Sequence, residues 1–152
     1  MDWRVSVRVP RFSVFLMLVV VTQNCRAELA VVLVVDKDSP LDSISTLDIR
    51  KAYLGISVVV GGKNIQPLRW RNDARLNQIF LQSIIAMSQR SYERRLLSLV
   101  LKYGTPRPVE VDSHERLLII LARQPSAIAY MWKSDADSDK RIKIIRVLWR
   151  ET

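Results

Sequence analysis

The chain has 152 residues, of which 49% are hydrophobic and 26% charged, and it carries a net charge of +9 at neutral pH. This length suits one compact domain with a single hydrophobic core. The positive charge favours anionic partners, such as nucleic acid, an anionic membrane surface or a small oxyanion, although it also serves solubility. With one cysteine and one histidine, the chain has no disulfide framework.

The first 27 residues have the pattern of a secretion signal. Three arginines accompany a run at 12–21 that is apolar except for Ser13, and Cys25 and Ala27 are small residues three and one positions before a cut after Ala27. Ten residues are too few to span a bilayer, which needs about 20 in a helix. A longer span reaching to residue 35 would bury Arg26 and Glu28, at a cost of up to about 3 kcal/mol each.

We therefore expect a cleaved signal peptide at 1–27 and one domain at 28–152 that is periplasmic or secreted. An uncleaved anchor and an ordinary buried segment are the alternatives. Cleavage removes Cys25, so the mature domain forms no disulfide and uses no cysteine in catalysis or in a zinc site. It leaves 20 basic and 14 acidic side chains, a net charge of +6. Export argues against nucleic acid as the partner, and cleavage leaves no stable membrane span.

The first half of the domain begins with a strand. Residues 29–35 are a continuous apolar run with four valines, which is typical of a strand buried on both faces of a parallel sheet. Residues 36–42 form a polar loop. Ser45 and Asp48 then make a capping box at the start of a helix that ends at Gly55.

Two extended runs, 56–60 and 65–70, flank a glycine-containing turn and predict a hairpin. Pro67 cannot donate to a ladder, so the second run is expected at an edge or loosely paired. Asn72 or Asp73 caps the long helix that follows. Its apolar stripe consists of Leu76, Ile79, Phe80, Ile84 and Met87, with Ser83 in the same row.

The second half continues the alternation of helices and strands. Ser88 caps a helix that ends at Gly104 and carries a stripe of Tyr92, Leu96, Leu99, Val100 and Tyr103. Ser113 caps the next helix, with Arg116 at its third position. Strands are expected at 109–111, 127–131 and 142–149, with a solvated turn at 135–140. The pattern predicts an α/β three-layer domain with a mainly parallel sheet.

The order of these segments is similar to a known family. The pieces are 47–55 (LDIRKAYLG), the turn before 65–68 (IQPL), Phe80, Met87-Ser88, the helix 92–104, and 125–130 (PSAIAY). They resemble the second lobe of the phosphate-binding proteins of bacterial ABC importers, in the type II periplasmic binding protein superfamily. The resemblance covers residues 29–149 and implies a short, single-lobe form of a solute-binding protein.

The chain departs from this family at its anion loops. The Gly/Ser/Thr-rich phosphate loop of the first lobe has no counterpart here. In the second lobe the family has Arg, two residues, then Ser-Gly-Thr, whereas this chain reads Arg71-Asn72-Asp73-Ala74. Ser126 and Ala129 stand where the family's PGAIGY segment has glycines. The resemblance is therefore more specific for the fold than for the ligand.

The candidate anion site is the junction before the long helix. A helix N-terminus offers free N–H donors and the positive end of its dipole. Arg69 and Arg71 would add charge-assisted donors, and Asn72 and Asp73 would complete the site. A carboxylate at Asp73 would, however, repel a dianion. The alternative is that Asn72 and Asp73 only cap the helix.

Other chemistry-bearing residues are better explained without a cofactor or a metal. His114 has no second histidine beside it and is expected as an exposed helix residue. Asp135, Asp137 and Asp139 alternate as in a calcium loop, but the glycine and glutamate of such a loop are absent. The aromatic residues Tyr130, Trp132 and Trp149, with Met131, are expected to pack in the core or at its edge. Arg90, Arg94 and Arg95 form a solvated face that could meet an acidic partner.

The function predicted is that of an exported, non-enzymatic, solute-binding-like protein. It would bind phosphate or another oxyanion in connection with an ABC-type uptake or sensing system. The alternative is an envelope interaction module or sensor accessory that has lost ligand binding. A hydrolase is disfavoured because no nucleophile–base motif is present. Whether a partner or a second copy supplies the other lobe is left open.

Overall fold

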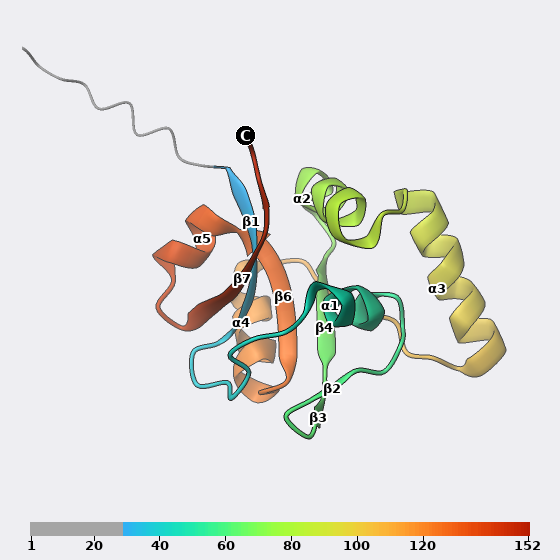
Figure 1. The fold of residues 1–152 in the computed structure, drawn as a ribbon, viewed down its shortest axis with the longest axis horizontal. Helices are drawn as coiled ribbons and strands as arrows, with labels where there is room; N and C mark the ends of the chain where they lie inside the picture. Colours follow the sequence, from blue (N-terminus) through green and yellow to red (C-terminus); the bar gives the residue numbers. More distant parts are fainter. Residues whose placement is uncertain (1–28) are drawn as a thin grey trace, which may run out of the picture.

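The computed structural model describes residues 29–152, so the predicted signal peptide at 1–27 lies outside the described residues. The strands are β1 (Ala30–Asp36), β2 (Val59–Val60), β3 (Lys63–Asn64), β4 (Gln66–Trp70), β5 (Val109–Val111), β6 (Ala127–Trp132) and β7 (Ile142–Arg150). The helices are α1 (Thr46–Tyr53), α2 (Ala74–Phe80), the π-helix η1 (Leu81–Ile85), α3 (Gln89–Tyr103), α4 (His114–Arg123) and α5 (Lys133–Ser138). Five strands form the central sheet in the order β5-β4-β6-β1-β7, and β2 and β3 form a separate hairpin (Figure 1).

The sheet is mainly parallel, as the sequence predicts. β4 is parallel to β5 and to β6, whereas β1 is antiparallel to both β6 and β7, so four of the five strands run in one direction. The prediction for β1 is right in its burial on both faces and wrong in its direction. A strand covered by helices on both sides has the same continuous apolar sequence whichever way it runs.

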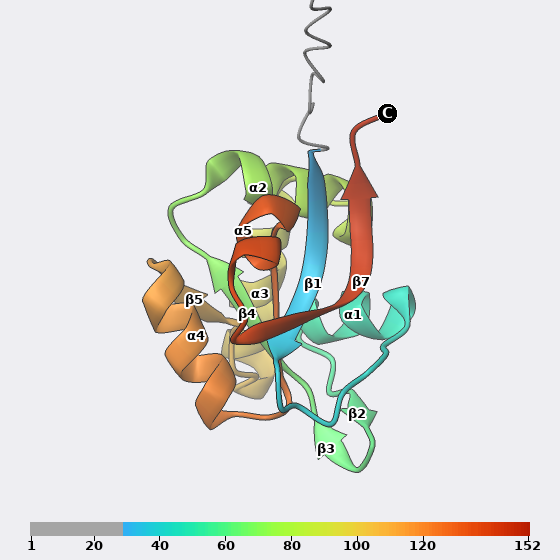
Figure 2. The same cartoon turned by 90° about the vertical axis from the view of Figure 1, so that its left-hand side faces the viewer.

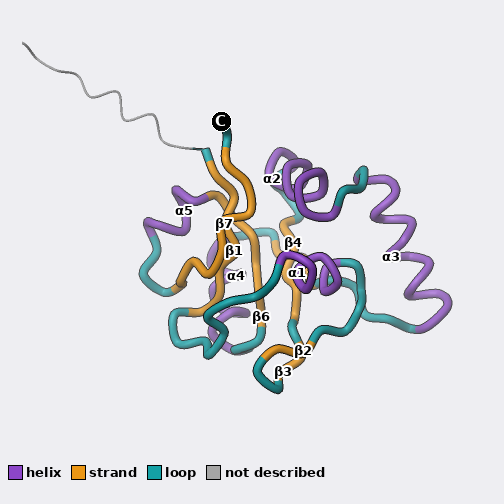
Figure 3. The backbone as a smooth tube through the Cα atoms, viewed as in Figure 1, coloured by secondary structure: helices purple, strands orange, loops and turns teal. Residues whose placement is uncertain are grey.

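Two apolar clusters lie on opposite faces of the sheet, which makes the three layers (Figures 2 and 3). Val31, Leu33 and Val35 point to the face covered by α1, α2, η1 and α3. Val32 and Val34 point to the face covered by α4 and α5. All five side chains have an exposed fraction of 0%. This alternation explains why residues 30–35 must be apolar throughout.

β4 is an interior strand, which contradicts the edge position expected from Pro67. Gln66 pairs with Ala127 and donates its backbone N–H to the carbonyl of Ser126 at 3.0 Å, so it faces β6. Successive backbone groups alternate between the two sides, so Pro67 turns its nitrogen toward β5. β5 begins to pair with β4 only at Leu68. Pro67 therefore lacks its N–H on a side where no partner strand is present, and the interior strand tolerates the proline.

The predicted solvated turn at 135–140 is also wrong in part, because residues 133–138 form α5. Ala136 is buried in the cluster beneath α4, and Lys133 and Asp137 form an ion pair across one turn. One buried methyl group and one i,i+4 ion pair stabilise this helix, which its charged sequence does not predict. The predicted caps Ser45, Ser88 and Ser113 are confirmed, each accepting a hydrogen bond from the third residue of its helix.

The α3 stripe is confirmed only in its first half. Tyr92 and Leu96 are buried, whereas the side chain of Tyr103 is 75% exposed. α3 therefore begins against the core and ends away from it, as Figure 1 shows. Among residues 29–152, no helix combines the length and the apolar character that crossing a bilayer requires.

Candidate functional site

The predicted site residues lie at the carboxyl end of β4. Hydrogen bonds to the neighbouring elements hold this end of the strand in place. The Tyr53 hydroxyl donates to the carbonyl of Leu68 at 2.8 Å, and Trp70 Nε1 donates to the carbonyl of Tyr130 at 2.7 Å. Asn77 Nδ2 in turn donates to the carbonyl of Trp70 at 2.8 Å. In open α/β sheets, the carboxyl ends of parallel strands are the usual place for ligands.

An aromatic layer supports this segment. The rings of Phe80 and Tyr130 are stacked with centroids 3.9 Å apart, and Tyr53 meets Phe80 edge-on at 4.7 Å. Burial raises the pKa of Tyr53, Tyr92 and Tyr130, so their hydroxyls stay neutral and act as donors. The Tyr130 hydroxyl donates to Asn77 Oδ1 and the Tyr92 hydroxyl to the carbonyl of Tyr53, at 2.5 and 2.7 Å. These bonds fix α1, α2 and α3 to the strand.

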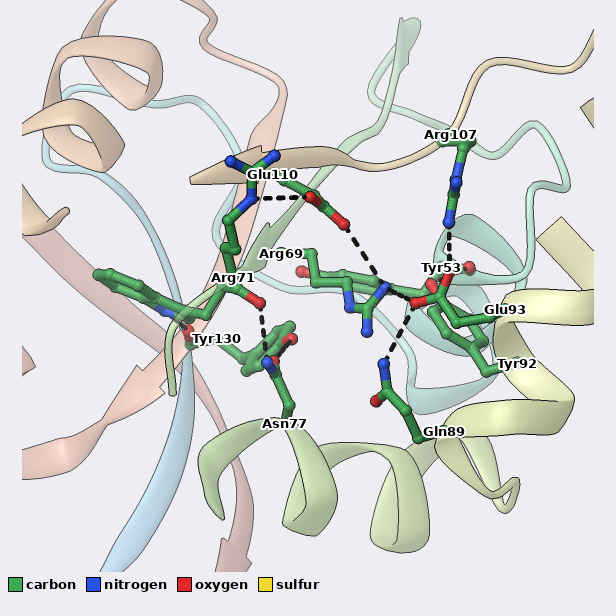
Figure 4. Close-up of polar contacts among 11 residues, drawn as sticks. Tyr53, Arg69, Arg71, Asn77, Gln89, Tyr92, Glu93, Arg107, Glu110 and Tyr130 are labelled. Carbon is green, nitrogen blue, oxygen red and sulfur yellow. Dashed lines mark hydrogen bonds and ion pairs between the residues drawn. The ribbon is translucent and has the colours of Figure 1, made fainter. Parts of the chain in front are cut away.

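Arg69 is almost completely buried, with 5% of its surface exposed, and carboxylates from other elements balance its charge. Its Nη1 donates to Glu93 Oε1 at 2.5 Å and lies 3.8 Å from Glu110 Oε1. The guanidinium also lies 5.1 Å from the ring centroid of Tyr92. Arg107 binds the other oxygen of Glu93, so α3, β5 and the loop between them converge on one residue of β4 (Figure 4).

This network shifts the pKa of Glu93. Burial by itself raises the pKa of this carboxyl group. The hydrogen bond from Arg69, together with the charges of Arg69 and Arg107, outweighs burial and leaves the pKa below its ordinary value. Glu93 is therefore ionised at neutral pH and forms ion pairs with Arg69 and Arg107.

Arg71 is the accessible cation of the site, with 64% of its side chain exposed. Its Nε lies 3.2 Å from Glu110 Oε2, and this is an exposed ion pair of modest strength. Figure 4 shows Glu110 between Arg71 and Arg69, so one carboxylate serves both.

Arg69 and Arg71 line a hollow of about 520 Å³, here called the arginine hollow. Its other polar lining residues are Asn77, Gln78, Gln82, Ser88, Gln89, Glu93 and Glu110. α3 begins at this hollow, capped by Ser88, and its first turn contains no acidic residue. The arginine hollow thus combines an accessible guanidinium, several amide donors and the N-terminus of a long helix.

Asn72 and Asp73 lie in a different hollow of about 480 Å³, here called the histidine hollow, which also includes Asp112, His114 and Trp132. Asp73 caps α2: its Oδ1 accepts from the N–H of Leu76 at 2.9 Å, and its Oδ2 accepts from Trp132 Nε1 at 2.8 Å. Asn72 Nδ2 donates to the carbonyl of Asp112 at 3.4 Å. The four predicted residues are consecutive or nearly so, but the structure divides them between two hollows.

His114 differs from the expected exposed helix residue. Its side chain is 39% exposed, and its Nε2 lies 3.0 Å from Asp139 Oδ2. Hydrogen bonds from Arg141, and then from His114, hold the pKa of Asp139 well below its usual range. Residues 29–152 contain no group of three or more histidine, cysteine or acidic side chains that could hold a metal ion.

Sequence reasoning missed the carboxylates of the site. Glu93 is 24 positions from Arg69, and no spacing rule joins them. Glu110 offered a weak signal, because it stands between the two valines of a short strand. It is directly opposite Arg69 in the β4–β5 register. The pairing of β4 with β5 brings Glu110 to Arg69, and the packing of α3 brings Glu93.

Comparison with solved structures identifies the fold. An ABC-type phosphate transport receptor from Vibrio cholerae superposes with a TM-score of 0.54 at 16% identity, over 78% of this chain and 46% of the receptor. The fold is similar to one lobe of that receptor. A putative phosphate ABC transporter substrate-binding protein with bound phosphate from Clostridium perfringens gives 0.55 at 14% identity, over 78% of this chain and 45% of that one.

A possible phosphate binding protein from Planctomyces limnophilus gives a TM-score of 0.55 at 12% identity, over 82% of this chain and 46% of that one. No protein-family model and no curated protein matches the sequence. At these identities the likeness concerns the fold. The chain spans about half the length of the receptors it matches.

Proposed function

We propose that the protein is an exported, non-enzymatic, solute-binding-like protein of the cell envelope. It binds a small oxyanion such as phosphate weakly, in connection with an ABC-type uptake or sensing system. The observation that carries this proposal is the arginine hollow at the carboxyl end of β4, in a fold similar to one lobe of phosphate receptors.

The donors of the arginine hollow suit an oxyanion. Arg71 supplies an exposed charge, and the amides of Gln78 on α2 and Gln82 on η1 supply neutral donors. Gln89, at the start of α3, already donates one amide N–H to Glu93 Oε1 at 3.2 Å. Arg69 is less available, because Glu93 holds it at 2.5 Å. Within the predicted set, we assign Arg71 the direct contact and Arg69 a supporting charge. Asn72 and Asp73 are proposed to shape the junction from the other side.

The internal carboxylates make the binding weak. An arriving dianion must displace Glu110 from Arg71, and it feels the charge of Glu93 across the same hollow. Asp73 adds a third negative charge at the start of α2. A dissociation constant in the millimolar range corresponds to about −4 kcal/mol, which one guanidinium and a few amide bonds can supply.

Titration with phosphate and sulfate, followed by calorimetry and by NMR of backbone amides, tests this proposal. We expect the amide signals of Ser88 and Gln89 to shift with millimolar midpoints. Arg71→Ala should abolish the shifts, and Glu110→Gln should strengthen binding because it releases Arg71. Arg123→Ala, which removes an exposed arginine from α4, is the matched control. The absence of any shift at Ser88 and Gln89 at saturating phosphate would reject oxyanion binding.

A second candidate is an interaction module that has lost ligand binding. It is favoured by the ion pairs and hydrogen bonds within the site, since Arg69 Nη1, Arg71 Nε and Asp73 all have partners within the chain. In that case another envelope protein covers the carboxyl end of β4. Crosslinking in intact cells through a photoreactive residue at Gln82, in the arginine hollow, should then trap one defined partner. A matched probe at Gln124 on the opposite side of the sheet should not.

A further inference from the structure

The outer face of α3 is a second surface that the proposed function does not use. Arg90, Arg94, Leu97 and Leu101 follow one another at intervals of four, three and four residues, so they share one face of the helix. Leu97 and Leu101 are 52% and 76% exposed, and Tyr103 at the end of the helix is 75% exposed. Figure 1 places α3 at the margin of the molecule, on the side away from α5.

This apolar ridge lies in a positively charged stretch of the described chain. Residues 86–108 contain five basic side chains and a single acid, Glu93. Glu93 points inward and is bound by Arg69 and Arg107, so it does not offset the charge of the outer face. The outer face of α3 therefore combines large apolar side chains with uncompensated cations.

We propose that α3 docks on an anionic membrane surface. Leu97 and Leu101 enter the interfacial region, and Arg90 and Arg94 bind lipid phosphates beside them. Complementary charge argues for this occupant, because basic helices with exposed leucine bind anionic bilayers by burying the apolar side and neutralising headgroups.

A protein partner fits this ridge less well. Stable protein interfaces bury about 800 Å² on each partner and place an apolar anchor in a pocket. The α3 ridge is convex and presents two apolar side chains, Leu97 and Leu101, on a single helix. A fluid bilayer adapts to such a convex ridge, whereas a folded partner would need a matching groove.

An environment-sensitive dye tests the docking at the residue that should enter the lipid. Leu101→Cys is labelled in a Cys25→Ser background and mixed with vesicles of phosphatidylglycerol and phosphatidylethanolamine, or of phosphatidylcholine alone. We expect a blue shift and increased emission with the anionic vesicles only, reversed by high salt. The same dye at Ile119→Cys, which is 45% exposed on α4, is the control and should not respond. The readout is local, so it reports α3 rather than any other part of the chain.

Two charge-matched double variants distinguish docking through α3 from non-specific electrostatic attraction of the whole protein to the vesicles. Arg90→Gln with Arg94→Gln should weaken the response at position 101 about tenfold or more, whereas Arg116→Gln with Arg123→Gln on α4 should change it little. Circular dichroism confirms that each variant is folded. No blue shift at position 101, an equal shift at position 119, or equal losses in the two pairs would each overturn the proposal. Failure of phosphate titration would leave this surface unaffected, since α3 presents a different face to the arginine hollow.

Discussion

Arg69 gives the site its electrostatic character, because a nearly buried guanidinium requires counter-charges. Glu93 lies 2.5 Å away, and Glu110 at 3.8 Å is a second source of negative charge. Removing one partner of a buried pair is costly because it leaves the other charge in a medium of low dielectric. Glu93 and Glu110 thus weaken oxyanion binding, and they also compensate the charge of Arg69 on an interior strand.

The pH dependence of stability should report this pair. The folded-state pKa of Glu93 is lowered, so its contribution is fully present above the unfolded pKa of about 4.3 and is lost as pH falls through the folded value. Glu93→Gln should cost about 1–2 kcal/mol at pH 7, a reduced figure because Glu93 is partly exposed and Glu110 remains. Urea denaturation at steps from pH 7 to pH 2.5 should show the difference from wild type shrinking on acidification. A constant difference would contradict this assignment.

Asp73 permits a test of its role as a cap. Asp73→Ala removes the bonds to Leu76 N–H and Trp132 Nε1 and should lower the free energy of unfolding by about 1–2 kcal/mol. Asp73→Asn keeps the cap on Leu76 N–H but places a donor NH2 group against Trp132 Nε1, so only the capping part of the stability should remain. Denaturant midpoints measure both. If alanine and asparagine are equally destabilising, the bond to Trp132 rather than capping explains the residue.

Residue-scale prediction from sequence succeeded where the chemistry is local. Ser45, Ser88 and Ser113 cap helices that begin at the next residue, so each signal and its consequence lie within four positions. It failed for Glu93 and Glu110, whose partners come from other elements. A capping side chain binds the first turn of its own helix, so the local sequence predicts it. These ion pairs join residues that only the tertiary fold brings together.

Among the elements, η1 ends in a strained turn at the rim of the arginine hollow. The π-helix ends at Ile85, and the next residue, Ala86, has a φ of 58° in the left-handed region and is the only such non-glycine residue in the described chain. Left-handed backbone costs an alanine about 1 kcal/mol. The sequence gives no sign of this turn, because glycine or asparagine is the usual marker there.

Ala86→Gly should therefore stabilise the protein by about 0.5–1 kcal/mol, despite the greater freedom that glycine gives the unfolded chain. Ala122→Gly, at an exposed position in α4, is the control and should destabilise it by a similar amount. The midpoint of thermal or urea unfolding distinguishes the two. A loss of stability at position 86 would show that the turn does not hold the strain inferred from its φ angle.

Helices and strands were largely predictable from periodicity and caps, and the exceptions have physical causes. Pro67 predicts an edge strand, but its nitrogen points to the β5 side of β4, where the pairing with β5 begins only at Leu68. The sequence of α5 predicts a turn because Asp135 and Asp137 are typical of loops. The direction of β1 could not be predicted, since burial on both faces produces the same apolar run in either orientation.

For the whole molecule, the neighbouring ends of the domain offer a test. Ala30 pairs with Arg150, and the N–H of Glu151 donates to the carbonyl of Leu29 at 2.9 Å. A permutant of residues 29–152 that joins these ends with a short glycine-rich linker and opens at Gly61–Gly62 should keep the native circular dichroism spectrum. Opening between Ala129 and Tyr130 interrupts β6 and should abolish cooperative unfolding. Failure of the first permutant alone would show that the hairpin is needed for folding.

The antiparallel interior strand β1 also sets an order of assembly. Val31 pairs with Trp132 on one side and with Trp149 on the other, so the first strand made waits about a hundred residues for its neighbours. Until β6 and β7 emerge, the valines of β1 have no sheet in which to be buried, and distant pairings of this kind form slowly. The export that we propose requires a chain that stays unfolded during its passage, and the layout of the sheet delays formation of its core until the last strand has been made.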